Sequence, residues 1–341
     1  MVDSTAAGTA SGAPPWFEAE WWDRASAWIT NELDRLGRPP TGPIETIHQR
    51  PWSAFARVPT AQGTVYFKAS APALRFEGPL TQALAESHPD VSAPFLSMDA
   101  RRGWTLVAHV GDSLRSKIQS PEDLPLWHPI LRRYVELQIE LAPRVPEFLA
   151  FGAPDRRLER LPQAFEALLH AEESLRLGRA GGLSLEEHQR LLALRPQFAV
   201  DCQELAAFSL PTTLVHEEVH DANVLVRPGG GPVFVDWGDS SVGHPFFSVL
   251  VMLRHAAYRQ NIPESDPAIQ RLQEVYLEGW TSFGSIAELR RAASIAYRLA
   301  MVVRSLAYEA VFGPLRESFR IENDSTSGWL QEFLQAEASA G

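Results

Sequence analysis

The chain of 341 residues is 45% hydrophobic and 21% charged, which is ordinary for a globular protein and leaves room for two lobes. Its net charge of −11 argues against a nucleic-acid partner, because phosphate contacts need clustered lysine and arginine. No apolar run reaches the ~18 residues of a membrane span, and no secretory signal or cysteine pair is present, so we expect a cytoplasmic protein without a membrane partner.

The N-terminal region begins with small and polar residues, and residues 1–15 are expected to form a disordered tail. Apolar residues then recur at helical spacing over residues 16–36. Gly37 ends this pattern, and Pro39-Pro40 prevents its continuation. The sequence therefore predicts a helix whose tryptophan-rich face packs against a sheet.

From Ile44 onward the hydrophobic period changes to that of short strands separated by turns. The order of these elements indicates a small five-stranded lobe crossed by one helix. The predicted strands cover 44–49, 54–58, 64–69, 91–96 and 104–109, and the predicted helix covers 76–86.

A lysine in the third predicted strand is unusual for this chain. Of its 31 basic residues, only Lys68 and Lys117 are lysine. A compact ammonium suits a tight site for phosphate oxygens, where arginine cannot replace it. Lys68 is therefore a candidate phosphate-binding residue. Glu77, early on the helix that follows, is its expected partner, and Glu86 is the alternative.

The second half of the chain has mostly helical patterning, punctuated by proline and glycine. This pattern indicates a helix-rich lobe that closes around one hairpin. The predicted helices cover about 123–142, 161–178, 184–208, 245–260, 266–283, 285–312 and 326–338.

The stretch LVHEEVHDANVLVRPGGGPVFVDWGD carries most of the candidate chemistry. It places His216, Glu218, His220 and Asn223 in one short loop. Two hydrophobic runs around a Pro-Gly-Gly-Gly-Pro turn follow and predict a hairpin, and the second run leads to Asp236. Oxygen donors from Asn223 and Asp236 suit a divalent metal, and the Glu218 carboxylate beside them can take a hydroxyl proton.

The same loop also spells H-E-x-x-H, from His216 to His220, which is a zinc-protease signature when the segment is helical. The hairpin that follows argues against a helix. No glutamate occurs between Val219 and Pro263, so only His244 is left as a third zinc ligand. A zinc hydrolase is therefore the third of three functional hypotheses.

This loop and hairpin resemble the catalytic segment of the aminoglycoside phosphotransferase-like family, a relative of the protein and choline kinases. The family pattern is H-G-D-x-H-x-x-N, then a hairpin, then I-D-W. The matching residues are His216, His220, Asn223, Asp236 and Trp237. Two positions depart from it, because Glu217 stands where the family often has glycine and Glu218 where it has its catalytic aspartate.

The resemblance implies an α+β, protein-kinase-like fold with two lobes, in which a small five-stranded antiparallel N-terminal lobe adjoins a larger, mostly helical C-terminal lobe. Residues 16–107 would form the nucleotide-binding lobe, residues 108–112 the hinge, and residues 113–341 the catalytic and substrate lobe.

The resemblance also implies transfer of the γ-phosphoryl group of ATP, or of another nucleoside triphosphate, to a hydroxyl of a small molecule. Glu218 would take the hydroxyl proton, His216 would brace the loop, and His220 would contact the loop or the phosphate. Asn223 and Asp236 would hold Mg²⁺.

The nucleotide contacts implied by the resemblance come from the first lobe. Lys68, held by Glu77, would grip the phosphates. Ser53, in a turn without glycine between the first two strands, would reach them through its hydroxyl. The backbone of Ala108 and Val110 would meet the adenine edge.

The departures at Glu217 and Glu218 keep a second hypothesis open, a catalytically silent protein that binds nucleotide or metabolite. The acceptor is not specified by the sequence, although an acidic chain suits a cationic molecule. The oligomeric state is not specified either.

Overall fold

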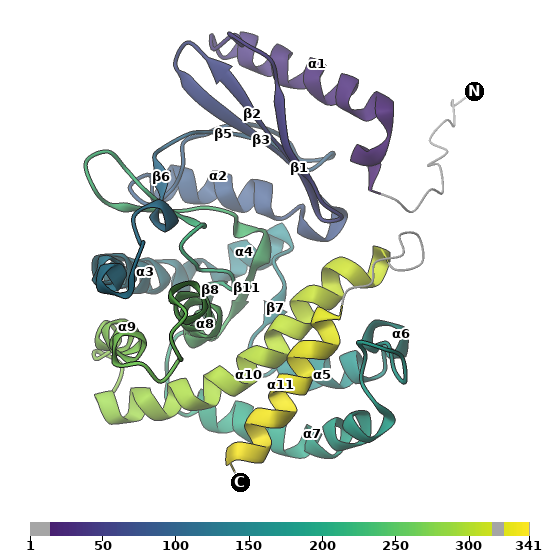
Figure 1. Ribbon diagram of the computed structural model, residues 1–341, viewed down its shortest axis with the longest axis vertical. Coiled ribbons are helices and arrows are strands. Elements are labelled where there is room, and N and C mark those ends of the chain that lie inside the picture. The colour runs from purple at the N-terminus through teal and green to yellow at the C-terminus, as the bar shows by residue number, and fades with distance from the viewer. Residues whose placement is uncertain (1–13, 316–323, 341) are drawn as a thin grey trace.

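The computed structural model describes residues 14–315 and 324–340, which form two lobes (Figure 1). A cleft lies between these lobes. The predicted tail, residues 1–15, lies almost wholly outside the described residues. The two-lobed α+β fold predicted from the sequence is present, because a five-stranded sheet and one covering helix form the smaller part and helices dominate the larger part.

The sheet of the smaller lobe is antiparallel throughout, with strand order β1-β2-β3-β5-β4. Alternating burial along β2 and β3 shows one face packed against the core, which is what their alternating sequence predicts. The strands are β1 (Glu45–Gln49), β2 (Ser53–Thr60), β3 (Gly63–Ser70), β4 (Phe95–Asp99) and β5 (Trp104–Ala108).

Helix α1 (Ala19–Arg35) covers one face of this sheet (Figure 1). Trp21 meets Phe67 of β3 and Trp104 of β5 edge to face or tilted, with ring centroids 6.2 and 5.5 Å apart. The predicted packing of the tryptophan-rich helix face against a sheet is therefore confirmed. Large aromatic rings bury much apolar area, so they form the core of this small lobe.

Helix α2 (Glu77–Ser87) lies between the sheet and the larger lobe (Figure 1). Its buried residues Leu80 and Leu84 belong to the hydrophobic core of the larger lobe. The predicted strand at 91–96 is shifted, because residues 91–94 run across to the second lobe, where the Val91 carbonyl accepts a hydrogen bond from Phe234 N at 2.9 Å.

The larger lobe contains two small sheets that hold the loop and hairpin (Figure 1). The strands β6 (Asp112–Ser113), β9 (Val224–Val226) and β10 (Pro232–Phe234) form one, and β7 (Asp155–Arg156), β8 (Thr213–His216) and β11 (Ser240–Gly243) form the other. The predicted hairpin is β9 and β10. The short strands β6, β7 and β11 escape sequence prediction, since two to four residues show no period.

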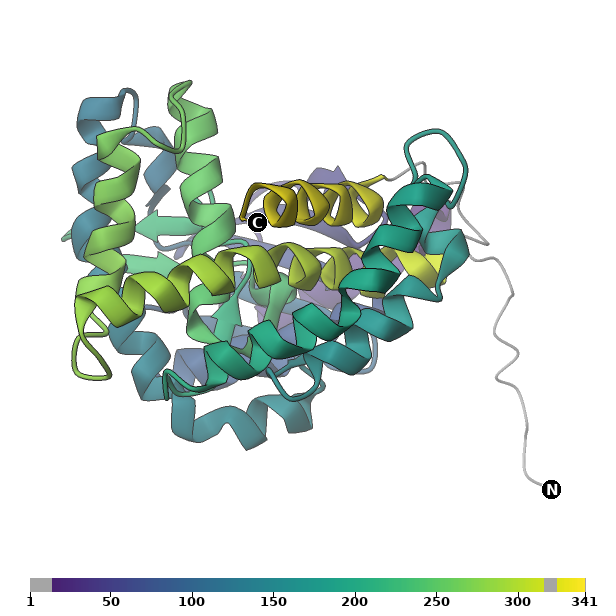
Figure 2. The same ribbon diagram turned by 90° about the horizontal axis from the view of Figure 1, so that it is seen from below.

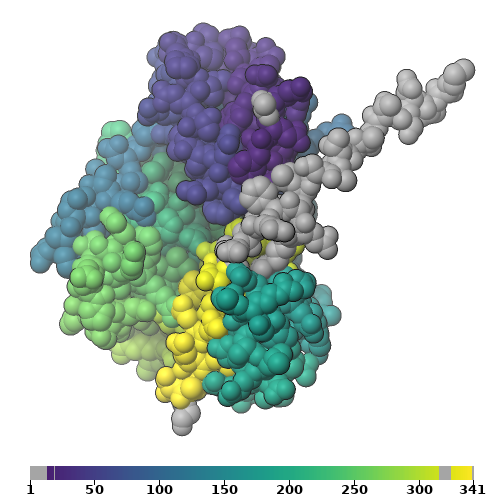
Figure 3. Space-filling model, turned by 45° about the vertical axis from the view of Figure 1, so that its right-hand side comes forward, coloured from purple at the N-terminus to yellow at the C-terminus, as the bar shows by residue number. Residues whose placement is uncertain are grey.

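Helices make up most of the rest of this lobe, and α10 and α11 lie side by side along its length (Figure 2). In Figure 3, α11 runs over the surface between the segment that holds α7 and the segment that holds α8 and α9. The helices are α3 (Trp127–Leu141), α4 (Val145–Phe151), α5 (Leu161–Leu169), α6 (Glu172–Leu175), α7 (Leu185–Ala206), α8 (Val249–Gln260), α9 (Pro267–Glu278), α10 (Ile286–Phe312) and α11 (Ser325–Ala340).

Several predicted helices have other bounds in the structure. The helix expected at 123–142 begins as a 3-10 helix at Pro121–Leu126, and the helix expected at 266–283 ends at Glu278. The helix expected at 161–178 is broken into α5 and α6 where Ala171 takes a ψ of 63°, and α6 ends where Arg176 takes a φ of 49°. The helix expected from residue 245 begins as a 3-10 turn at Pro245–Ser248 before α8 starts. No helix in the described parts of the chain is both long and apolar enough to cross a bilayer.

Gly111, in the segment that joins the lobes, has no space for a side chain. Its φ is +153°, and a Cβ there would lie 2.1 Å from the carbonyl oxygen of Val226. Gly111→Ala is therefore expected to lower the free energy of unfolding by about 2 kcal/mol or more, as measured by urea unfolding. Gly229→Ala is the control, because a Cβ at Gly229 meets nothing within 4 Å. Equal losses in the two variants would contradict this prediction.

Candidate active site

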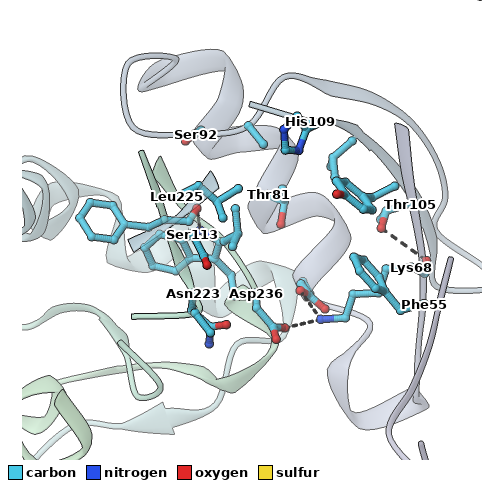
Figure 4. Close-up of a pocket in the computed structure, with 18 of the residues that line it drawn as sticks. Phe55, Lys68, Thr81, Ser92, Thr105, His109, Ser113, Asn223, Leu225 and Asp236 are labelled. Carbon is cyan, nitrogen blue, oxygen red and sulfur yellow. Dashed lines mark hydrogen bonds and ion pairs between the residues drawn. The ribbon is translucent and has the colours of Figure 1, made fainter. Parts of the chain in front are cut away.

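A cleft of about 500 Å³ lies between the two lobes. Its lining comes from the five-stranded sheet and α2 on one side and from the β9–β10 hairpin on the other. Figure 4 shows Lys68 and Asp236 approaching each other across it. The residues predicted from the sequence that line this cleft are Ser53, Lys68, Glu77, Ala108, Asn223 and Asp236.

Lys68 on β3 joins the two sides of the cleft. Its Nζ lies 2.7 Å from Oε1 of Glu77 on α2 and also contacts Oδ1 of Asp236, which follows β10 (Figure 4). The hydroxyl of Ser70 donates to Oε2 of Glu77 at 3.0 Å and holds that carboxylate. The predicted ion pair between Lys68 and Glu77 is therefore present, and the alternative partner Glu86 accepts a hydrogen bond within α2 instead.

The charges of Lys68 and its two carboxylate partners, Glu77 and Asp236, stabilise one another. Burial opposes the charge on Lys68, but the carboxylates of Asp236 and Glu77 outweigh it and raise the pKa of Lys68. Desolvation likewise opposes the charge on Asp236, and the Lys68 ammonium outweighs it and lowers the pKa of Asp236. Asp236 is therefore ionised and Lys68 protonated at neutral pH.

Asn223 and Asp236 supply oxygen donors that fit Mg²⁺, a cation that binds carboxylate and amide oxygens. The Nδ2 of Asn223 donates to the backbone oxygen of Glu218 at 3.1 Å, which orients the amide. Its oxygen then lies on the side toward Asp236 (Figure 4). Asp236 has a φ of 65°, a left-handed conformation that turns its carboxylate into the cleft at the end of the hairpin.

His216 ends β8 and braces the loop that follows it. Its Nε2 donates to the Val235 carbonyl at 2.9 Å, and its Nδ1 accepts from the backbone N–H of Glu218 at 3.3 Å. Burial lowers the pKa of His216 to about 4, so the ring is neutral at physiological pH. Both ring nitrogens are engaged, and the ring packs against Trp237.

The H-E-x-x-H sequence does not form a zinc site of the protease type, because its first histidine ends a strand and residues 217–220 form a turn. We expect elemental analysis of the purified protein to find far less than one zinc per chain. Stoichiometric zinc that is lost in both His216→Ala and His220→Ala would contradict this prediction.

Glu218 is paired with an arginine and does not line the cleft. Arg304 of α10 contacts Oε1 of Glu218 through Nη2, and its Nη1 lies 3.5 Å from Oε2 of Glu217 and 3.9 Å from Oδ1 of Asp239. Desolvation opposes the charge on Glu218, but Arg304 outweighs it and lowers the pKa of Glu218 to about 2. Burial raises the pKa of Glu217.

His220 lies in a network on the far side of the loop and does not line the cleft either. Its ring stacks on His255 of α8 with centroids 4.6 Å apart, and its Nε2 lies 3.4 Å from Oε2 of Glu218. One potential metal-ligand atom from each of His220, Asp221 and His255 lies within 4.8 Å of the other two. Arg115 donates to Asp221 at 2.9 Å and lies 3.0 Å from His255 Nε2. The positive charge of the Arg115 guanidinium therefore already pairs with this cluster.

The turn between β1 and β2 is held by its own backbone. The N–H groups of Arg50 and Ser53 donate to each other's carbonyls at 2.7 and 3.3 Å, and Trp16 donates to the Arg50 carbonyl at 2.7 Å. These N–H groups are therefore engaged. The Ser53 hydroxyl lies 3.3 Å from Nε2 of His48, and both residues line the cleft. Trp52 at the tip meets Phe312 of α10, with ring centroids 5.6 Å apart.

The hinge segment lies at the opposite end of the cleft. The N–H of Ala108 donates to the Pro94 carbonyl and that of His109 to the Thr64 carbonyl, both at 2.9 Å. Ala108, His109 and Gly111 line the cleft, whereas Val110, which the sequence predicts to bind the cofactor, is outside the lining.

The sequence did not reveal two features of the site. One is an apolar slot in the cleft, walled by residues of both lobes, namely Phe55, Tyr66, Val107, Leu225 and Phe234. The other is Arg304, whose only sequence signal is its place inside the apolar run Ala-Met-Val-Val-Arg-Ser-Leu. A charged side chain at such a position is buried only when it has partners, so the run could have indicated a buried ion pair.

Solved structures of kinases and phosphotransferases share this fold. The *Plasmodium vivax* ethanolamine kinase matches with a TM-score of 0.60 at 12% identity, covering 90% of this chain and 84% of that one. The choline kinase LicA from Streptococcus pneumoniae matches with a TM-score of 0.58 at 11% identity, covering 93% of this chain and 99% of that one. A macrolide 2'-phosphotransferase from Brachybacterium faecium matches with a TM-score of 0.53 at 14% identity, covering 89% of this chain and 97% of that one. No curated protein sequence matches.

The model of the phosphotransferase enzyme family matches residues 50–285, which include Lys68, the loop after β8 and the hairpin with Asp236. This range is well over half of the chain and covers every residue that lines the cleft except Ile47 and His48. The resemblance inferred from the sequence motif is therefore confirmed, and the chain belongs to the phosphotransferase enzyme family.

Proposed function

We propose that the protein transfers the γ-phosphoryl group of ATP, or of another nucleoside triphosphate, to a hydroxyl of a small molecule. One observation carries the proposal: Lys68 of the first lobe, held by Glu77, meets Asp236 of the second lobe across the cleft. An ammonium suited to phosphate and a carboxylate suited to a divalent metal thus lie together, which is an arrangement that supports phosphoryl transfer.

The proposed nucleotide lies along the cleft. Its base occupies the apolar slot between Phe55 and Tyr66 on one side and Leu225 and Phe234 on the other. Its phosphates extend toward Lys68, so that the ammonium lies near the oxygens that carry most charge. We infer this orientation because Lys68 is the one described lysine that lines the cleft, and the apolar slot lies elsewhere in the same cleft.

The proposed reaction is an in-line displacement at the γ-phosphorus. The acceptor oxygen forms a bond to phosphorus while its proton passes to the Glu218 carboxylate. Glu218 lies outside the lining of the cleft, but 22% of its side chain is exposed and open to an acceptor. The bond from phosphorus to the leaving oxygen breaks, and its electron pair stays with the nucleoside diphosphate. Lys68 stabilises the charge that develops on the phosphate oxygens.

Mg²⁺, when bound, would neutralise phosphate charge and help to align the reacting groups. Asn223 and Asp236 are the residues that would hold it, through the amide oxygen and the carboxylate. The Lys68 ammonium that contacts Asp236 would then also bind phosphate oxygen.

The proposal is tested with Mg-ATP and a panel of hydroxylated acceptors. The panel contains ethanolamine, choline, a macrolide and an aminoglycoside, because the protein's structural neighbours bear these names. We expect acceptor-dependent ADP release and a product heavier by one phosphoryl group in mass spectrometry. No binding of Mg-ATP by calorimetry would overturn the proposal. Binding without turnover of any acceptor would favour the catalytically silent alternative.

A further inference from the structure

Arg304 lies in the middle of α10, and its side chain is only 2% exposed. Charged side chains are almost never buried this far without partners. Its guanidinium contacts Glu218 and lies within 3.9 Å of both Glu217 and Asp239. The arginine therefore connects α10 to two separate segments, the loop after β8 and the turn that follows Asp236.

The carboxylate of Glu218 is the one in direct contact with Arg304. The backbone of Glu218 is already held on both sides, since its N–H donates to His216 and its carbonyl accepts from Asn223. Only the side-chain torsions remain to be fixed. Glutamate is one methylene longer than aspartate, so the extra length carries the carboxylate toward α10 while 22% of the side chain stays exposed.

Aromatic rings on the same face of α10 hold Arg304 in place. Tyr308 lies over its guanidinium at 5.2 Å from the ring centroid, and Phe312 stacks on Tyr308 at 5.9 Å with an interplanar angle of 6°. Trp52 of the β1–β2 turn meets Phe312 at the end of this row. The row shields the guanidinium from water and restricts its rotamers, so its position relative to Glu218 is well defined.

We propose that Arg304 is a positioning residue that holds the longer side chain of Glu218 where its carboxylate orients the acceptor hydroxyl, so that Glu218 and Arg304 act as a matched pair. This inference rests on the proposed phosphoryl transfer and names a residue that the family motif does not contain. Misplacement of a catalytic group by about 1 Å can cost ~100-fold in rate, so a longer side chain needs a fixed anchor.

A double-mutant cycle of Arg304→Lys and Glu218→Asp tests the pairing. In the wild-type background, Arg304→Lys is expected to lower kcat by about 10- to 100-fold and to leave KM for Mg-ATP unchanged, because Arg304 does not line the cleft. In the Glu218→Asp background we expect the shorter carboxylate to lie beyond contact with Arg304. There, the same lysine substitution should cost less than about threefold, which is a strongly non-additive result.

Arg298→Lys is the matched control. Arg298 lies on the same helix and also bridges two carboxylates, with Nε 2.7 Å from Glu337 and Nη2 3.4 Å from Asp201. Its ion pairs lie away from the loop after β8. Arg298→Lys should therefore lower thermal stability as much as Arg304→Lys does, with kcat unchanged.

Three results would overturn the inference. They are an unchanged kcat in Arg304→Lys, an equal loss in both backgrounds, and a gain in kcat, which would show that Arg304 masks Glu218. If Arg304→Lys does not fold, Arg304→Gln combined with Glu217→Gln removes one charge of each sign and takes its place.

Crystal structures of the wild-type and Arg304→Lys proteins with a non-hydrolysable Mg-nucleotide test the inference without turnover. The Glu218 carboxylate should shift by about 1 Å or more in the variant. An unmoved carboxylate would refute the positioning role even if no acceptor were found. Absence of turnover in the wild type, by contrast, would count against the proposed function. The shift of the Glu218 carboxylate would still decide whether Arg304 positions it.

Discussion

Lys68→Met is expected to lower kcat/KM for Mg-ATP by about 100- to 1,000-fold. Lys68 is the described lysine that faces the cleft, and it is held between Glu77 and Asp236 by two ion pairs. Removing one preorganised donor to a developing charge typically costs this much in rate. Methionine matches the length of the side chain, so the change isolates the loss of the ammonium. Steady-state kinetics with varied Mg-ATP measures it.

Lys117→Met is the control for this prediction. Lys117 is the only other lysine of the chain, and it is exposed in the second lobe. The same chemical change there should leave kcat/KM within about twofold, because an exposed residue away from the cleft contributes little. Circular dichroism checks folding, since Lys68→Met leaves Glu77 with only Ser70 as its partner. A folded Lys68→Met protein with full activity would remove Lys68 from the site.

Asp236→Asn is expected to abolish Mg²⁺-dependent nucleotide binding and to lower turnover by about 1,000-fold. A metal ion supplies several kcal/mol of charge stabilisation in phosphoryl transfer, and each 1.36 kcal/mol corresponds to a factor of ten. Asparagine is chosen because it tolerates the left-handed backbone that Asp236 adopts at φ 65°. Calorimetric titration of ATP with and without Mg²⁺ measures the effect.

Asp99→Asn is the control for the carboxylate change. Asp99 ends β4 and pairs with Arg102 at the surface, away from the cleft. Its substitution should leave the affinity for Mg-ATP unchanged. Nucleotide binding that depends on Mg²⁺ equally in wild-type and Asp236→Asn proteins would show that Asp236 does not hold the metal.

The central residues of the candidate site could be predicted from the sequence because they lie in short segments with distinctive motifs. Lys68 stands out because the chain has only one other lysine. Asn223 and Asp236 flank a hairpin whose glycine-rich turn marks it clearly. Glu77 could be chosen as the partner of Lys68 because a helix that follows the third strand brings its first turn back over the sheet.

The ion pair of Glu218 with Arg304 could not be predicted in the same way. It joins residues 86 positions apart in sequence. No local pattern reports such a contact, because it depends on how α10 crosses beneath the loop. The same reason applies to Trp52 and Phe312, which lie at opposite ends of the fold in sequence and meet only through the packing of the lobes.

The sequence by itself determined the family, the five-stranded sheet with its covering helix, and the oxygen donors at the ends of the hairpin. These follow from hydrophobic period, turn chemistry and motif spacing, which act over a few residues. Only the tertiary structure decided which residues line the cleft and which lie outside its lining. Val110 is outside the lining, and Glu218 and His220 are engaged with α10 and α8, because side-chain orientation and buried charge pairing are set by packing between distant elements.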